Sequence, residues 1–194
     1  MSRTATIARI TSETSVELQL DLDGSGAYEI HTGFGFFDHM LSHVAKHAGL
    51  NLTLKATGDL HVDEHHLVED IGICLGQTVA RALGDKRGIQ RFGVSFVPMD
   101  EALARTVIDL SGRSYLAFAA DFSRESINGF SLELVQDFFQ AVANEGRMNI
   151  HIALLYGRNA HHEVEAVYKS FGRALGAAIR VGHLDSIPST KGVL

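Results

Sequence analysis

The sequence predicts an α+β protein built from two similar lobes. Apolar and polar residues alternate in several short segments, and apolar residues recur at helical spacing in others. The order of these segments in residues 1–92 returns in residues 93–194, and both long helical segments begin on a nearly repeated stretch, "VDEHHLVED" and "NAHHEVEA". No Pro- or Ser-rich linker separates the halves. We therefore expect one compact unit, with each lobe a sheet that carries helices on one face.

The first half has the pattern of two strands, a helix, a strand and a long helix. Residues alternate in "TATIARI" (4–10) and in "SVELQLDLDGSG" (15–26), which predicts two strands and then a glycine-rich turn. In "FFDHMLSHVAKHAGL" (36–50) apolar residues lie three and four apart until a glycine ends the pattern, as in a helix. "NLTLKATG" (51–58) alternates again, and "HHLVEDIGICLGQTVARALG" (65–84) has the spacing of a long helix.

The second half repeats this order. Strands are expected at 92–99, 103–112, 114–122 and 148–157, and helices at 131–146 and 161–180. Both long helices carry "RALG" in their later part, but the second copy is displaced by one helical turn. The sequence therefore indicates an imperfect duplication with lobes at 1–92 and 93–194.

Composition and charge exclude several classes of protein. The net charge is −6 and no run of Lys and Arg is present to neutralise phosphates, which argues against a nucleic-acid-binding protein. No apolar run reaches membrane-spanning length, and the first residues lack the apolar core of a signal peptide. Cys74 is the only cysteine, and its apolar helical surroundings indicate a buried, inert thiol. We expect a globular protein of the cytoplasm that binds neither nucleic acid nor membrane.

The repeated histidine motif predicts a metal site. Residues four apart share one face of a helix, so His65 and Glu69 can bind the same ion, as can His161 and Glu165. The second histidine of each pair points about 100° away and would reach a different ion. A single copy could be a solvated first turn, but two copies in equivalent places predict a dimetal site. Imidazole and carboxylate ligands without thiolate suit Mn, Fe, Zn, Co or Ni.

The first helix of each half extends the site. His39, His43 and His47 recur every four residues on one stripe, and Asp137 stands in the second half where His39 stands in the first. Histidine and aspartate both ligate hard or borderline cations. A stripe of histidines can also be an ordinary solvent-facing side of a helix, and we expect this for His43.

Several motifs along the whole chain point to a known family. They are "GFGFFDHML", "ATGDLHVDEHHLVEDIGI", "PMDEALA", "DLSGR", "GRNAHHEVEAVYKSFGRAL" and "IPSTKGVL". Together they closely resemble the imidazoleglycerol-phosphate dehydratase family of histidine biosynthesis. The resemblance implies a duplicated fold of the ribosomal protein S5 domain 2-like type, and removal of water from imidazole-glycerol phosphate to give imidazole-acetol phosphate. It also implies two Mn²⁺ ions per active site, other divalent metals not excluded, and an octahedral homo-oligomer of twenty-four subunits with active sites between subunits.

The resemblance assigns roles to residues of this chain. The metal ligands would be His39, His65, His66, Glu69, Asp137, His161, His162 and Glu165. Asp137 stands where relatives usually carry a longer histidine or glutamate, and its shorter side chain would ligate the metal directly or through a bridging water. The reaction-centre residues would be Glu13, His47 and Lys169, and the substrate-binding residues, which contact its phosphate, would be Arg91, Arg113, Ser189, Thr190 and Lys191.

The chemistry of the dehydration explains why metal ions and a base are both needed. The hydrogen that leaves the substrate is not next to a carbonyl, so it is barely acidic and a carboxylate alone does not remove it easily. Metal ions on the imidazole nitrogens would convert the ring to imidazolate, which is electron-rich enough to expel the adjacent hydroxyl, and Glu13 would then act as the base. Two other functions use the same ligands: a dimetal hydrolase, which would release inorganic phosphate, and a protein whose ions only join subunits.

Overall fold

The computed structural model describes residues 3–183 and 185–194 of the chain. The first half contains β1 (Thr4–Ile10), β2 (Thr14–Asp21), β3 (Tyr28–His31), α1 (Gly35–Ala48), β4 (Asn51–Gly58) and α2 (His65–Leu83). The second half contains β5 (Phe92–Met99), β6 (Ala102–Asp109), β7 (Tyr115–Ala119), β8 (Ser126–Ile127), β9 (Phe130–Ser131), α3 (Leu134–Gly146), β10 (Asn149–Tyr156) and α4 (Ala160–Ala178).

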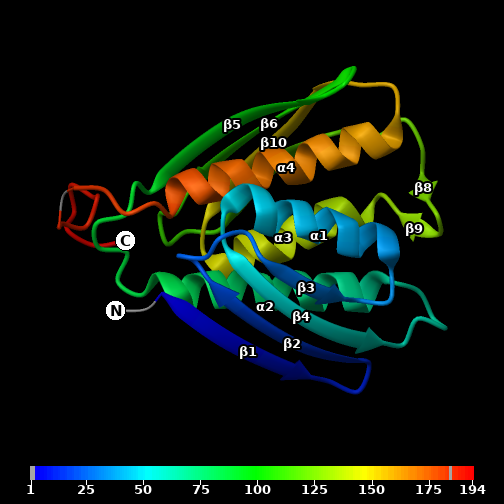
Figure 1. The fold of residues 1–194 in the computed structure, drawn as a ribbon, viewed down its shortest axis with the longest axis horizontal. Helices are drawn as coiled ribbons and strands as arrows, with labels where there is room; N and C mark the ends of the chain where they lie inside the picture. The colour runs from blue at the N-terminus through cyan, green and yellow to red at the C-terminus, as the bar shows by residue number, and fades with distance from the viewer. Residues whose placement is uncertain (1–2, 184) are drawn as a thin grey trace.

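Two four-stranded sheets form the outer layers, and the four helices lie between them (Figure 1). The strand orders are β1-β2-β4-β3 and β5-β6-β10-β7, so both sheets have the same topology. In each sheet the last pair, β3 with β4 or β7 with β10, is parallel and the other pairs are antiparallel. The α+β prediction, with helices on one face of each sheet, is confirmed.

The sequence pattern missed two features of this topology. The strand β3 has only four residues, and Ile30 is its one buried side chain, so it shows too little alternation to be recognised. The short hairpin β8–β9 lies between β7 and α3, where the sequence predicts no strand after residue 122 and a helix from residue 131. With β3 included and the β8–β9 hairpin set aside, both halves have the order of three strands, a helix, a strand and a long helix.

The inner faces of both sheets contribute to one apolar core. On β2, Val16, Leu18 and Leu20 point inward and are buried, while the residues between them are exposed. Buried residues of all four helices join the same cluster. The boundary predicted between residues 92 and 93 lies at the start of β5, and that division of the chain stays a prediction. Within the residues described, no helix is both long enough and apolar enough to cross a membrane.

Glycines let the helices of the two halves pack closely. On α4, a methyl group added at Gly172 would lie 2.9 Å from the carbonyl oxygen of Val44, and one added at Gly176 would lie 2.5 Å from that of Ala48. Two glycines at the same spacing on α2 meet the backbone of α3 in the same way. Helix α1 of the first half therefore lies against α4 of the second, and α2 lies against α3. This pairing brings side chains from different halves together.

We expect Gly172→Ala to destabilise the protein, although alanine is the better helix former. The propensity gain of about 1 kcal/mol is outweighed by the overpacking between α4 and α1, which typically costs about 1–3 kcal/mol. The control is Gly35→Ala at the start of α1, where an added methyl group meets nothing within 4 Å. Urea denaturation of both variants tests this; an unchanged or higher free energy of unfolding for Gly172→Ala would show that the helices separate without cost.

Candidate metal centre

The four helices run in the same direction, so their N-terminal ends lie at one end of the molecule (Figure 1). The histidine pairs begin α2 and α4 at this end. The first turn of α4 is held by Asn159, whose side-chain oxygen accepts a hydrogen bond from the His161 backbone N–H at 3.0 Å. His39 and Asp137 lie near the starts of α1 and α3. The predicted ligands therefore gather at the same end of the helix layer.

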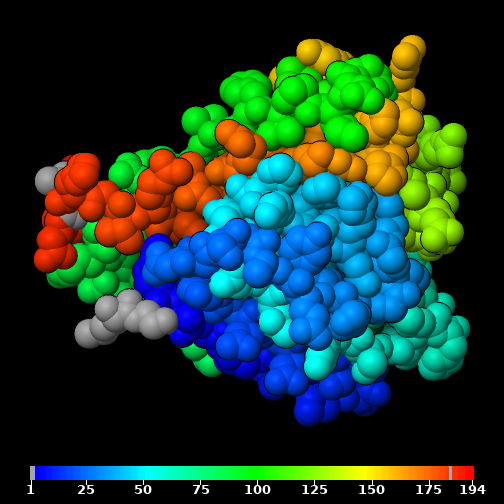
Figure 2. Space-filling model, in the orientation of Figure 1, coloured from blue at the N-terminus to red at the C-terminus, as the bar shows by residue number. Residues whose placement is uncertain are grey.

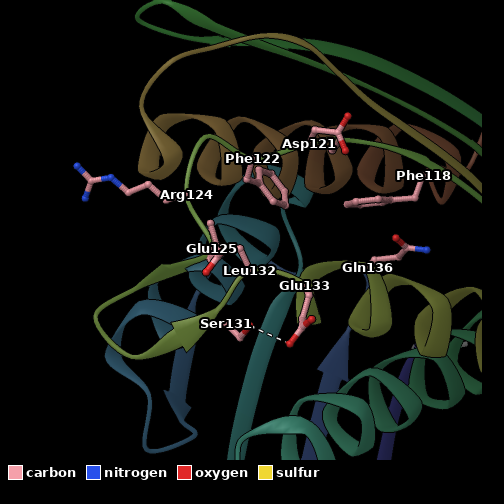
Figure 3. Close-up of a pocket in the computed structure, with 10 residues that line it drawn as sticks. Phe118, Asp121, Phe122, Arg124, Glu125, Ser131, Leu132, Glu133 and Gln136 are labelled. Carbon is pink, nitrogen blue, oxygen red and sulfur yellow. Dashed lines mark hydrogen bonds between the residues drawn. The ribbon is translucent and has the colours of Figure 1, made fainter.

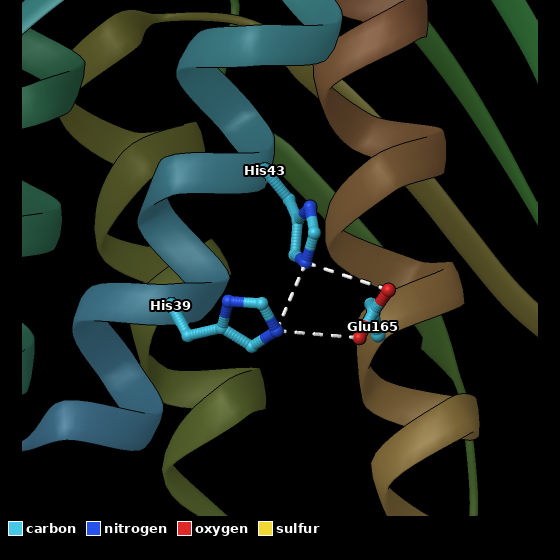
Figure 4. Close-up of side chains that lie close together, drawn as sticks. All are labelled: His39, His43 and Glu165. Carbon is cyan, nitrogen blue, oxygen red and sulfur yellow. Dashed lines mark hydrogen bonds and ion pairs between the residues drawn. The ribbon is translucent and has the colours of Figure 1, made fainter.

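The first group of ligands lies between α1 and α4, and we call it the α1/α4 cluster: His39, His43, His161, Glu165 and Lys169. The Glu165 carboxylate is its centre. The Nε2 atoms of His39 and His43 lie 3.4 Å from its two oxygens and 3.2 Å from each other (Figure 4). His161 Nε2 lies 3.1 Å from Glu165 Oε2, and Lys169 Nζ forms an ion pair with Oε1. Imidazole nitrogens around a carboxylate are a donor set that fits a divalent transition metal.

Burial shapes the charges in the α1/α4 cluster. Burial raises the pKa of the buried Glu165 carboxyl, but hydrogen bonds and charges from Lys169, His43 and His161 outweigh this and lower the pKa to about 2. Burial lowers the pKa of His43 to about 4, which keeps its ring neutral at neutral pH. A carboxylate and a neutral imidazole are the forms that ligate metals.

The expectation that His43 faces solvent is wrong. Its side chain is only 16% exposed because α4 packs over it and presents Glu165 to its Nε2 atom. The spacing of four residues placed His43 on the same stripe as His39, but the sequence does not say which helix covers that stripe. The stripe faces α4 because of the close α1–α4 packing.

The second group of ligands lies between α2 and α3, and we call it the α2/α3 cluster: His65, Glu69 and Asp137. These residues line a cavity of about 190 Å³. His65 Nδ1 is 3.8 Å from Asp137 Oδ2, and both side chains are more than 40% exposed. Glu69 is exposed as well. The α2/α3 cluster is therefore more open than the α1/α4 cluster.

The two clusters differ in the residues beside the ligands. Four residues after its glutamate, α4 has Lys169 and α2 has Ile73. Four residues after its first ligand, α1 has His43 and α3 has Ala141. The ligand pattern is duplicated, but at these two pairs of positions only the α1/α4 cluster has groups that can transfer protons. His47 belongs with them, because its ring stacks on His43 with 5.8 Å between centroids.

His66 and His162 point away from these clusters. Each ring is nearly perpendicular to that of the preceding histidine, with interplanar angles of 84° and 89°. His66 Nδ1 lies 3.1 Å from Asp59 and 3.8 Å from Glu13, and His162 Nδ1 lies 2.8 Å from Glu101. The Asp59 and Glu101 carboxylates accept hydrogen bonds from the two rings, which raises the pKa of His66 and His162. The sequence reading did not single out Asp59 or Glu101, since a carboxylate near a motif is common without contact.

The five residues assigned to the substrate phosphate lie at the other end of the molecule. The backbone N–H of Arg91 donates to the carbonyl of Ala178, the last residue of α4, and its side chain donates to the Pro188 carbonyl and to Asp109. Ser189, Thr190 and Lys191 follow directly in an exposed turn. The loop with Arg113 is also here, because Gly112 closely approaches the backbone of Leu194. This tail projects from the end opposite to the ligands (Figure 1 and Figure 2).

The most voluminous of the cavities described, about 480 Å³, lies near β7, the β8–β9 hairpin and the start of α3. Charged and polar side chains line it, among them Asp121, Arg124 and Glu125 (Figure 3). None of the predicted site residues is among its lining residues. The predicted ligands therefore place the candidate site at the N-terminal ends of the helices, and the volume of a cavity does not locate it.

Known proteins share this sequence and fold. The model of the family "Imidazoleglycerol-phosphate dehydratase" matches residues 32–175. Imidazoleglycerol-phosphate dehydratases of Lacticaseibacillus casei and Acidiphilium cryptum are each 54% identical to the chain, over 99% and 100% of it and the whole of each relative. The crystal structure of the Staphylococcus aureus dehydratase superposes with a TM-score of 0.84 at 41% identity, covering 92% of this chain and 99% of that one. That of Pyrococcus furiosus has a TM-score of 0.84 at 36% identity, covering 97% and 100%.

Proposed function

Because the chain belongs to the imidazoleglycerol-phosphate dehydratase family, we propose that it carries out its dehydration with two divalent cations held by the repeated ligand motif. The chain is a hydro-lyase of histidine biosynthesis and acts on a small phosphorylated imidazole. It removes water from imidazole-glycerol phosphate, and imidazole-acetol phosphate is the product. Cys74 is a buried thiol whose pKa burial raises to about 11, which is compatible with the reducing cytoplasm that we propose as its location.

The observation that carries the metal proposal is the convergence of three histidine nitrogens on the buried Glu165 carboxylate. The proposed ligands are His39, His161 and Glu165 in the α1/α4 cluster, His65, Glu69 and Asp137 in the α2/α3 cluster, and the outward rings of His66 and His162. We propose Mn²⁺ as the ion. When bound, the two cations would acidify the ring N–H of the substrate, and the more electron-rich deprotonated ring would favour departure of the adjacent hydroxyl.

The chain's own residues supply proton transfer and orientation. Glu13 takes the proton from the carbon beside the one that loses its hydroxyl, and the resulting enol becomes the ketone of the product. Burial and the positive charges of Lys169 and Arg173 lower the pKa of His47, so its ring is neutral at neutral pH. His47 and Lys169 act at the leaving hydroxyl, which departs as water. Arg91, Arg113, Ser189, Thr190 and Lys191 hold the phosphate and fix the orientation of the substrate.

These roles require more than one copy of the chain. The phosphate-binding residues lie at the C-terminal end of α4, about 26 Å from His161 and about 20 Å from Glu165 at 1.5 Å per residue. The substrate spans roughly 10 Å by standard bond lengths. Within one chain it therefore does not reach both groups. We propose that neighbouring copies complete each active site in a homo-oligomer, for which we expect the octahedral arrangement of twenty-four subunits.

The outer face of the second sheet supports this assembly. Phe92, Val94 and Phe96 on the edge strand β5, and Tyr115 on β7, are each more than half exposed on the face that the helices leave open. The corresponding face of the first sheet carries polar residues such as Glu17 and Gln19. The first sheet also exposes Ile10 and Tyr28, but the second sheet carries more exposed apolar side chains, which are typical of a protein–protein interface.

Removal of metal tests the proposal. We expect the protein stripped with a chelator to lose dehydration of imidazole-glycerol phosphate, and added Mn²⁺ to restore it, with no inorganic phosphate released at any stage. Undiminished dehydration by rigorously metal-free protein would overturn the metal proposal. Release of phosphate would indicate hydrolysis instead, and restored assembly without restored dehydration would indicate that the ions only join subunits.

A further inference from the structure

We propose that Asp59 and Glu101 are positioning residues that hold the Nδ1 atoms of His66 and His162, so that each ring presents its Nε2 atom to a cation of a neighbouring copy. This inference rests on the proposed metal function and deepens it. It concerns two carboxylates that are not ligands themselves and lie behind the ligands, in two different loops of the chain.

The contacts are specific on both sides. Asp59 follows the last residue of β4, and its carboxylate lies 3.1 Å from His66 Nδ1. Glu101 lies in the turn between β5 and β6, and its Oε2 lies 2.8 Å from His162 Nδ1. Among the described residues, neither carboxylate forms a hydrogen bond with any other side chain. Each carboxylate is therefore matched to one ring.

The geometry determines which nitrogen is free to bind metal. A neutral imidazole has one N–H donor and one acceptor nitrogen. A carboxylate at Nδ1 keeps the proton on that atom, which leaves the lone pair on Nε2. The ion pairs described for His66 and His162 are all with carboxylates outside their own α2/α3 and α1/α4 clusters, from which we infer that this lone pair is directed away from the ions of the same chain. The ring is thus fixed before a neighbouring copy arrives.

The carboxylates that contact the two histidines come from loops that are not equivalent in the two halves. The first half uses the residue after β4, and the second uses the turn between its first two strands. The equivalent turn of the first half contains Glu13, which lies 3.8 Å from His66 Nδ1. A carboxylate therefore stands at Nδ1 of both outward histidines although the loops that provide it are not equivalent. The positioning role rests on this recurrence of a carboxylate at the ring nitrogen in both halves.

The alternative is that each carboxylate and its histidine form an ordinary surface ion pair that does not affect metal binding. The affinity for Mn²⁺ distinguishes this alternative from the positioning role. Loss of a carboxylate behind a ligating histidine typically weakens metal binding about 10- to 100-fold. We expect this loss for Asp59→Ala and for Glu101→Ala, measured by competition with a chelator on the full-length protein. Glu101→Gln keeps an oxygen that accepts from Nδ1–H, so it should lose less than Glu101→Ala. The control is Glu125→Gln, an exposed carboxylate in another loop.

The readouts distinguish positioning from folding and from the wider proposal. We expect the melting temperature of metal-free Asp59→Ala and Glu101→Ala to match that of the metal-free wild type, so that only metal binding differs. Wild-type Mn²⁺ affinity in both alanine variants would overturn the positioning role and leave the metal centre in place. Equal losses for Glu101→Gln and Glu101→Ala would also overturn it. A wild-type protein that binds no Mn²⁺ would instead overturn the proposed metal function and this inference together.

Discussion

We expect Glu13→Gln to lower kcat by about 10²- to 10⁴-fold, the usual contribution of a general base. Glutamine keeps the length and shape of the side chain but does not accept the proton from carbon. Because Glu13 is not among the proposed ligands, the variant should bind Mn²⁺ and substrate nearly as the wild type does. The measurements are kcat, KM and the metal content of the purified protein.

The position of Glu13 suits this role. It lies in the turn between β1 and β2, and its backbone N–H donates to Thr11 Oγ1 at 3.1 Å. The same turn is fixed to α2, because the buried Asp70 accepts hydrogen bonds from Thr14 and Arg9. The Glu13 side chain itself is 52% exposed, and its carboxylate lies 3.8 Å from His66 Nδ1 and within 4.8 Å of the Asp59 carboxylate. A rigid turn thus presents a carboxylate that the rest of its own chain leaves accessible.

The matched control is Glu17→Gln in the adjoining strand β2. Glu17 is an exposed carboxylate on the outer face of the first sheet and should change kcat little. Near-wild-type turnover by Glu13→Gln would remove Glu13 from the reaction. A loss of Mn²⁺ from the variant would also contradict the role, because it would assign Glu13 to the support of His66 and not to proton transfer.

The fold was largely predictable because its strands and helices have clear periodicity. The limits expected for the segments at 4–10 and 51–58 agree with β1 and β4. The strand β3 was missed because one buried residue in four leaves no alternation. The pairing of α1 with α4, across the two halves, was not predictable either. It depends on close backbone contacts at Gly172 and Gly176, which a hydrophobic pattern does not reveal.

The site was predictable in its residue types and not in its geometry. The spacing of His161 and Glu165 placed both on one face of α4, and the structure brings their side chains within 3.1 Å. The partners from α1 depend on helix packing, which explains the error at His43. Glu101 contacts His162 across about sixty residues of sequence, a contact set by the turn between β5 and β6. Contacts between distant segments are a tertiary property that motif spacing does not contain.

The separation of ligands and phosphate-binding residues leads to the second large effect, rescue between two inactive variants. Glu165→Gln should lose activity because it removes the centre of the α1/α4 cluster, and Arg113→Ala should lose it because the phosphate is no longer held. If these residues act from different copies, an oligomer assembled from both variants contains some sites with an intact ligand cluster from one chain and an intact Arg113 from the other. In a site built from two chains, random mixing puts the required variant at both positions in about one quarter of the sites. If a third chain must also carry an intact residue at its own position, the fraction is about one eighth.

The experiment mixes the two inactive proteins after metal removal and reassembles them with Mn²⁺. We expect activity to rise from near zero to roughly 10–25% of the wild-type value, since each site draws on two or three chains. The control is Glu165→Gln mixed with His161→Ala, whose defects lie in the same cluster and should not complement in this way. No activity in the first mixture, with mixed oligomers verified by native mass spectrometry, would mean that a single chain supplies both groups. That result would contradict the position of Arg91 at the end of α4 and of Glu165 near its start.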